Sequence, residues 1–159
     1  MKYLGLICFL LSCSQILGAT LSLDQKSIFL VWSQAKFVSK EDTSGLPNII
    51  PISRINIKLV PERPVNEDGI PIRGEFVWDR SIKYKKDYQL PDKYEILIYI
   101  PLYIVDNEAF LDQTIYDTLL HEMLHYIFAF RGLNDSEFKI RYTDSHDWID
   151  ELWQQNSSK

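Results

Sequence analysis

The chain has very little cysteine. Its two cysteines, Cys8 and Cys13, lie close together near the N-terminus, so the chain beyond residue 13 can form no internal disulfide bond. The same absence excludes a cysteine nucleophile and a thiolate zinc site from that part of the chain. Because secreted eukaryotic domains of this size often carry disulfides, the composition favours a bacterial source.

Clustered positive charge is also lacking. The 159 residues include 17 Lys and Arg against 22 Asp and Glu, which gives a formal net charge of -5. The densest basic segment, residues 83–86, is followed at once by Asp87 and is typical of a solvated loop. Because phosphate binding needs clustered Lys and Arg, we predict no nucleic-acid partner.

Repeats and low-complexity tracts are absent as well. Hydrophobic residues make up 46% of the chain and charged residues 25%, a balance that is typical of a globular protein. A chain of 159 residues is long enough to bury a core but leaves no room for a second domain of ordinary size. We therefore predict a single domain, residues 20–159, that follows an N-terminal signal.

The predicted signal begins with Lys2 and continues as an apolar run over residues 3–11. Two endings fit the pattern. The small residues before Thr20 suit cleavage of a signal peptide over residues 1–19, whereas residues 10–13 resemble a bacterial lipobox in which Cys13 would be acylated. Both endings predict an exported protein that is secreted, periplasmic or a membrane-anchored lipoprotein. The only membrane contact expected is that N-terminal lipid anchor.

An uncleaved anchor is a third interpretation of this region, because no charged residue occurs from residue 3 to residue 23. Its polar side chains make the stretch a poor spanning helix, and we rank this interpretation last. These side chains are Ser12, Ser14, Gln15 and Thr20.

Hydrophobic periodicity predicts an α+β fold. We expect one helix from about residue 23 to residue 37, capped by Ser22, and then strands over residues 54–60, 74–78 and 94–104. Pro101 in the last strand indicates either an edge strand or the end of the strand. The helices would pack on a small, mostly antiparallel sheet.

A long helix follows the strands. Asp106 or Asn107 can cap it, and apolar residues recur at helical spacing up to about residue 131, where Gly132 is the predicted stop. A short C-terminal helix is predicted to begin near Asp144 or Ser145.

Within the long helix, His121, Glu122 and His125 form the HExxH pattern. Residues four apart on an α-helix lie one turn apart on the same face, so both histidines can bind one ion. Zinc lowers the pKa of a coordinated water to about 7, and Glu122, rotated by about 100° from His121, can take its proton as a general base. The pattern predicts a Zn2+ site; its alternative is a pair of histidines on an amphipathic helix without metal.

A catalytic zinc ion takes three protein ligands and keeps one position open. His146, the third histidine of the chain, is the predicted third ligand, because it follows a loop at the start of a helix. Its alternative role is that of a helix N-terminal residue paired with Asp144 or Asp147. Glu137 and Glu151 are the carboxylate alternatives for the third ligand.

Three further residues are candidates for supporting roles. Asp117, one turn before His121, could orient the ring of that histidine, and Tyr126 or Tyr142 could stabilise an oxyanion. Each also has an ordinary interpretation, as a solvated or a packing residue. The strand before the long helix could bind an extended peptide along its edge.

The order of these elements, together with Leu119-Leu120-His121-Glu122-Met123-Leu124-His125, resembles the SprT-like (Spartan-type) zinc metallopeptidases or another minimal HExxH lineage. The resemblance covers most of the chain after residue 19 in element order, and only the HExxH segment and, loosely, residues 144–148 at residue level. It implies a zincin-like fold with His121, His125 and His146 as zinc ligands and Glu122 as the catalytic base.

We therefore expect an exported zinc metallopeptidase that hydrolyses peptide bonds in a peptide or protein substrate. One alternative is a non-catalytic zinc-binding or protein-interaction module on the same scaffold, and another is a zinc hydrolase that acts on a non-peptide bond. The intact Glu122 favours an enzyme, because a purely structural zinc site needs no base beside the metal.

Overall fold

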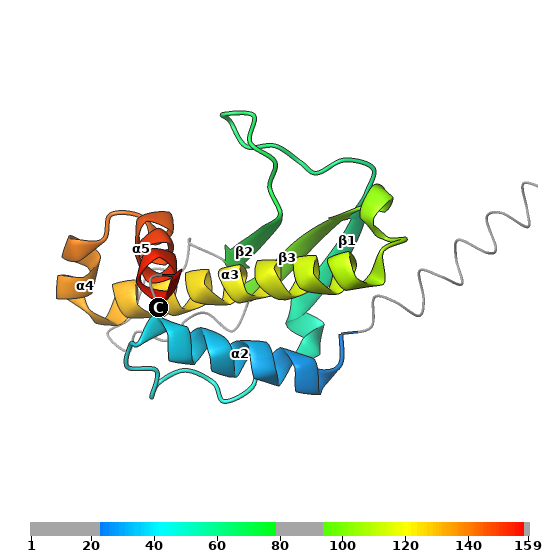
Figure 1. Cartoon of the computed structure of the whole chain (residues 1–159). Helices are drawn as coiled ribbons and strands as arrows, with labels where there is room; N and C mark the ends of the chain where they lie inside the picture. Colours follow the sequence, from blue (N-terminus) through cyan, green and yellow to red (C-terminus); the bar gives the residue numbers. More distant parts are fainter. Residues whose placement is uncertain (1–22, 79–93, 158–159) are drawn as a thin grey trace, which may run out of the picture.

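The computed structural model describes residues 23–78 and 94–157 (Figure 1). The predicted export signal and the basic segment of residues 83–86 lie outside the described residues. Within the described part of the chain, no helix is both long enough and apolar enough to cross a membrane. The elements are, in order, α2 (Gln25–Ser39), η1 (Ile52–Arg54), β1 (Ile55–Val60), β2 (Gly74–Trp78), β3 (Tyr94–Pro101), η2 (Leu102–Ile104), α3 (Glu108–Asn134), α4 (Ser136–Arg141) and α5 (Ser145–Ser157).

The first helix, α2, is capped by Asp24 rather than by Ser22. The Asp24 carboxylate accepts a hydrogen bond of 2.6 Å from the backbone N–H of Ser27, and this satisfies one of the unpaired amides at the helix start. Ser22 itself lies outside the described residues. The indole N–H of the buried Trp32 donates to the carbonyl of Pro47 at 2.8 Å, so its burial leaves no polar atom unpaired. The core face of α2 recurs at helical spacing and consists of Ile28, Val31, Trp32, Ala35 and Val38.

The α+β prediction is confirmed, but the sheet is mixed rather than mostly antiparallel. Its strand order is β1-β3-β2, and β3 pairs in parallel with β1 and antiparallel with β2. The sequence could not predict this, because alternation of polar and apolar residues marks a strand without indicating the direction of its partner.

The central strand is β3, so the edge alternative for Pro101 is wrong. Ile96, Ile98 and Ile100 are fully buried, as expected of a strand with neighbours on both sides. The strand ends at Pro101, because proline has no N–H to continue the ladder, and η2 follows. Among the described strands, β1 and β2 form the two edges of the sheet.

The long helix α3 spans 27 residues, which corresponds to about 40 Å. Asn107 caps it by accepting from the N–H of Phe110 at 3.1 Å, so the alternative cap Asp106 is not used. The predicted stop at Gly132 is wrong, because this glycine keeps a negative φ and the helix continues through it. The helix ends where Asp135 becomes extended and its side chain caps α4. α4 was not predicted, since six residues are too few for a periodic pattern.

The helices and the inner face of the sheet share one hydrophobic core. Figure 1 shows α3 running between α2 and the sheet, with α5 crossing its C-terminal half. Large fully buried side chains come from each of these elements, among them Trp32, Ile98, Met123 and Trp148. The HExxH segment is therefore held in a helix that packs into this core.

Candidate metal centre

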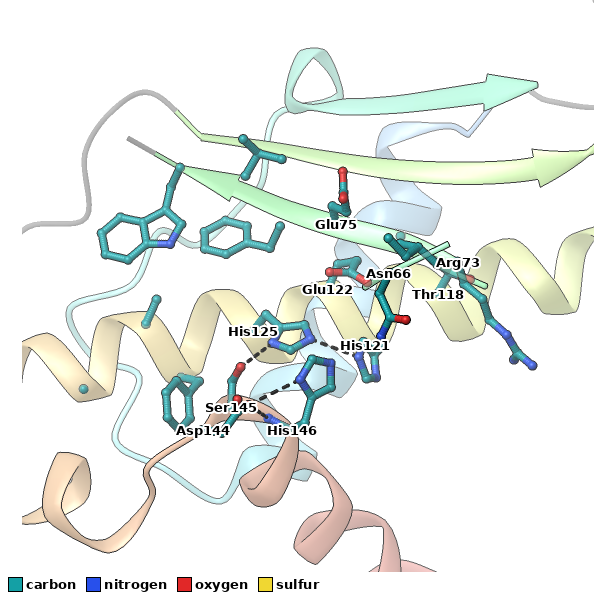
Figure 2. A pocket seen from close by; sticks show the side chains of 18 of the residues that line it. Asn66, Arg73, Glu75, Thr118, His121, Glu122, His125, Asp144, Ser145 and His146 are labelled. Carbon is teal, nitrogen blue, oxygen red and sulfur yellow. Dashed lines mark hydrogen bonds and ion pairs between the residues drawn. The ribbon is translucent and has the colours of Figure 1, made fainter. Parts of the chain in front are cut away.

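His121 and His125 lie one turn apart on α3 and point to the same side of the helix (Figure 2). Their Nε2 atoms are 3.0 Å apart. A tetrahedral zinc ion with Zn–N distances of about 2.0–2.1 Å would hold two ligand nitrogens about 3.3 Å apart. The two ring nitrogens are therefore close to the separation that a single ion requires.

The start of α5 brings the third histidine to this pair. The ring centroid of His146 is 4.6 Å from that of His125 and 5.6 Å from that of His121. One ligand atom from each of the three residues lies within 4.8 Å of the others, and no other such metal-ligand group occurs in residues 23–78 and 94–157. All three predicted ligands thus meet, although twenty residues separate His146 from His125.

Two neighbouring side chains orient these rings. Nδ1 of His125 is 2.9 Å from the hydroxyl oxygen of Ser145, and Nδ1 of His146 is 3.3 Å from a carboxylate oxygen of Asp144. When each Nδ1–H donates to its neighbour, Nε2 of each ring is left for a metal ion. The ordinary pairing considered for His146, with Asp144, is therefore present and compatible with a ligand role. Sequence reasoning missed Ser145, because nothing local links it to His125.

Burial favours the neutral form of the two imidazoles on α3. Burial, and then the nearby His146, lowers the pKa of His121 to about 4. Burial, and then the other two histidines, lowers the pKa of His125 to about 3. Neutral imidazole is the form that binds metal, so both rings are available at neutral pH.

Glu122 lies between α3 and β2, and its side chain is buried although it is a carboxyl group. Burial raises its pKa to about 8, while a hydrogen bond from the backbone N–H of Phe76 acts in the opposite direction. A cation nearby would lower this pKa and stabilise the charged form. The three imidazoles form a donor set that fits a divalent cation, and the buried acid follows one of them in the chain.

Gly74 at the start of β2 allows the strand to approach α3 so closely. A Cβ atom at this position would lie 2.6 Å from Cγ2 of Thr118 and 2.8 Å from Oε1 of Glu122. Any other residue would therefore push β2 away or displace the carboxyl of Glu122. Sequence reasoning missed this role, although a glycine in a strand is a known signal of close backbone approach.

The histidines and Glu122 line a groove between β2, α3 and the segment that leads into α5 (Figure 2). Gly74, Glu75 and Phe76 of β2 lie along one wall. Tyr142 and the residues up to His146 lie along the other. The site is therefore open to a ligand that passes along the edge strand.

The three residues predicted to have supporting roles lie in different surroundings. Asp117 lines the groove, but its carboxylate accepts from the side chain of Gln113 at 2.7 Å, and no contact with His121 is found. Tyr126 is buried, with its ring 4.8 Å from that of Tyr94, and its ordinary role in packing is the one observed. Tyr142 lies at the groove and donates its hydroxyl to Glu151 at 2.9 Å.

The carboxylate alternatives for the third ligand do not reach the histidines. Both oxygens of Glu151 are engaged, since they accept from Tyr142 and from the amide of Gln155. Glu137 lies exposed in the first turn of α4. Of the three candidates, only His146 lies beside His121 and His125.

Comparisons of the chain with protein-family models, with curated proteins and with solved structures find no match. The resemblance to SprT-like metallopeptidases therefore stays a prediction from the sequence. The function has to be inferred from the geometry of the site.

Proposed function

We propose that the protein is an exported zinc metallopeptidase of zincin-like fold, in which Glu122 is the general base. The observation that carries this proposal is the convergence of His121, His125 and His146 within 4.8 Å, beside a buried carboxyl group in an open groove. Export is proposed from the sequence alone, from Lys2 and the apolar run that follows it.

Three imidazoles form a ligand set that suits zinc and leaves one coordination position open. A bound zinc ion would supply Lewis-acid activation of a water molecule at neutral pH. The contacts of Ser145 and Asp144 support this role, because second-sphere hydrogen bonds from Nδ1 hold a ring in the tautomer that directs Nε2 to the metal.

Glu122 would take the proton of the attacking water and deliver it to the leaving amine. Its carboxyl group follows His121 directly in the chain and is held against β2 by the N–H of Phe76. A structural zinc site needs no acid beside the metal, and burying a carboxyl group is costly even with one backbone hydrogen bond. The geometry therefore favours the enzyme over the binding module.

The edge of β2 supports a peptide as the substrate. The carbonyl of Arg73 accepts from the N–H of Tyr99 on the neighbouring strand β3 at 2.9 Å, whereas the N–H of Phe76 points to Glu122. Because backbone groups alternate in direction along a strand, Gly74 and Phe76 direct theirs toward the outer edge. Glu122 accepts from the N–H of Phe76 there, so the groups directed to a peptide are the N–H and carbonyl of Gly74 and the carbonyl of Phe76. An extended peptide bound there by main-chain hydrogen bonds would run along the groove past the histidines. This edge replaces the one expected on the strand before the long helix, which is central.

The proposal is tested by measuring zinc content and peptide hydrolysis for the full chain and for Glu122→Gln. We expect about one zinc ion per chain in both, with hydrolysis reduced about 10²–10⁴-fold in the variant, because only the general base is lost. Glu137→Gln is the matched control, since it makes the same change at an exposed glutamate of α4 and should retain both zinc and activity.

The two alternatives give different results. Full zinc content without hydrolysis of any peptide in the unaltered chain would point to a binding module or to a non-peptide substrate. Absence of zinc binding would contradict the site itself. Unchanged hydrolysis in Glu122→Gln would remove this residue from the mechanism.

A further inference from the structure

The helix α2 presents an apolar face to solvent. Phe29, Leu30 and Phe37 are 45%, 57% and 78% exposed, on the side of the helix that faces away from the core. Single exposed apolar residues are ordinary on a protein surface. Two phenylalanines and a leucine on the outer face of one short helix form a patch of the kind that marks an interaction site.

The charges of α2 differ from those of the rest of the chain. It is the one described α-helix without an acidic residue, and it carries Lys26 and Lys36, with Lys40 just after its end. The net charge of the whole chain is -5, so acidic residues are concentrated elsewhere. Of the acidic groups at the ends of α2, Glu41 pairs with Arg131 at 3.1 Å, while Asp24 and Asp42 accept from the backbone N–H groups of Ser27 and Ser44.

The segment that precedes α2 in the chain is uncharged. No charged residue occurs from residue 3 to residue 23, and Gln25, the first residue of α2, follows Cys13 by twelve positions (25 − 13 = 12). Twelve residues reach at most about 40 Å when fully extended. A chain held at a membrane by this segment, or by a lipid at Cys13, would therefore keep α2 close to the bilayer surface.

We propose that α2 lies in the plane of an anionic lipid bilayer, with Phe29, Leu30 and Phe37 inserted at the interface and the lysines near the phosphate groups. Aromatic and aliphatic side chains on one face, flanked by Lys, are the features of helices that bind at membrane surfaces. Lys side chains near an anionic surface add electrostatic attraction. The helix α2 would then be a second membrane contact in addition to the predicted lipid anchor. This proposal does not depend on the proposed peptidase activity.

A second copy of the chain fits this face less well. Two α2 helices packed against each other would bring Lys26 and Lys36 of both copies together, and like charges oppose such a contact. Docking on lipid also leaves the groove open to water. α3 separates α2 from the sheet in Figure 1, and in Figure 2 α2 lies behind α3 while the three histidines lie in front.

Hydroxyl-radical footprinting of the full chain tests the proposal without altering any cysteine. The oxidation of single side chains is measured by mass spectrometry in buffer, on phosphatidylcholine vesicles, and on vesicles that also contain phosphatidylglycerol. We expect oxidation of Phe29, Leu30 and Phe37 to fall several-fold on the anionic vesicles. Ile140 on α4, which is 80% exposed, is the matched reference for Phe37 and should keep its oxidation rate.

Equal oxidation of the three α2 side chains with and without vesicles would overturn the proposal. Protection that is already complete in buffer would also overturn it, because the N-terminal segment or a second copy would then cover the face. Lys26→Glu should reduce the protection on anionic vesicles several-fold. Lys139→Glu, the same change at an exposed lysine of α4, should not; equal effects of the two changes would contradict the role of Lys26.

Discussion

The two halves of the candidate metal centre are built in different ways. His121, Glu122 and His125 come from consecutive turns of α3, in the middle of the core, and the pKa values of all three are shifted by burial. His146 and Asp144 come from the start of α5, and their side chains are 65% and 61% exposed. One half is rigid because the core holds it, and the other is held by hydrogen bonds at the surface.

This difference suggests separate roles for the two halves of the site. In the proposed mechanism the buried half fixes the position of the general base relative to two ligands, which is where small displacements have large effects on catalysis. The exposed half completes the ligand set and borders the groove through which a substrate would enter. We therefore expect that the loss of a ligand can be rescued by an added small molecule in the exposed half but not in the buried half.

The largest effect is expected from loss of a ligand. His125→Ala and His146→Ala should each reduce zinc affinity by more than about a hundredfold, since changes of second-sphere partners alone cost 10–100-fold. Added imidazole should restore zinc binding and hydrolysis in His146→Ala, because the vacated position is exposed. It should fail in His125→Ala, where the ring is largely enclosed. Equal rescue of both variants would contradict the distinction between the halves.

A smaller effect is expected when β2 is displaced from the buried half. Gly74→Ala would place a methyl group against Thr118 and Glu122, so hydrolysis should fall about a hundredfold while zinc content stays unchanged. Gly132→Ala is the matched control, because no atom lies within 4 Å of a Cβ there. In a helix the change should increase stability by about 0.5–1 kcal/mol. Retained activity in Gly74→Ala would show that the close approach is not needed for catalysis.

Removal of the hydroxyl of Ser145 should have a milder effect. Ser145→Ala takes away the hydrogen-bond partner of Nδ1 of His125, and we expect zinc affinity to fall about tenfold. Competition with a chromogenic chelator measures this change. If the affinity is unchanged, the contact does not orient the ring.

The last effect concerns the stability of the zinc-free protein rather than zinc binding or hydrolysis. Burial raises the pKa of Glu122 from 4.5 to about 8, so between these pH values the folded state holds a proton that the unfolded state has released. The stability that this proton provides is present below pH 4.5 and is lost as the pH rises toward 8. Glu122→Gln should therefore be more stabilising at pH 8 than at pH 5, by on the order of 2 kcal/mol in urea unfolding. A gain that does not vary with pH would contradict the shift.

The lowered pKa values of the histidines also make stability depend on pH, but in the opposite direction. His121 and His125 stay neutral in the folded protein, whereas in the unfolded chain they take up protons below about pH 6.5. Their contribution to stability is therefore lost as the pH falls below that value. Because Glu122→Gln leaves both rings in place, the difference between variant and unaltered chain isolates the titration of Glu122.

The sequence predicted those features of the fold that depend on residues close together in the chain. The spacing of His121 and His125 follows from helix geometry, and the strand of residues 74–78 was predicted with its observed limits. Pairing direction in the sheet, the continuation of α3 past Gly132 and the helix α4 were missed. Each of these depends on contacts between segments distant in the chain, or on a competing cap such as Asp135.

The parts of the candidate site that could not be predicted also depend on contacts between distant segments. His146 was predicted as a ligand because it follows a loop at the start of a helix, and no local pattern placed it near His125. The contact of Ser145 and the close approach of Gly74 exist only once α5 and β2 are packed against α3. Tyr126 shows the opposite case, in which a candidate for catalysis belongs to the core.

X-ray absorption at the zinc edge of the zinc-loaded full chain tests the central claim most directly, because it counts the ligands of the metal. Three imidazole nitrogens at about 2.0–2.1 Å and one further light atom are the predicted first shell, and His146→Ala should reduce the imidazole count to two. A shell with two imidazoles and a carboxylate in the unaltered chain, or no zinc at all, would contradict the three-histidine site.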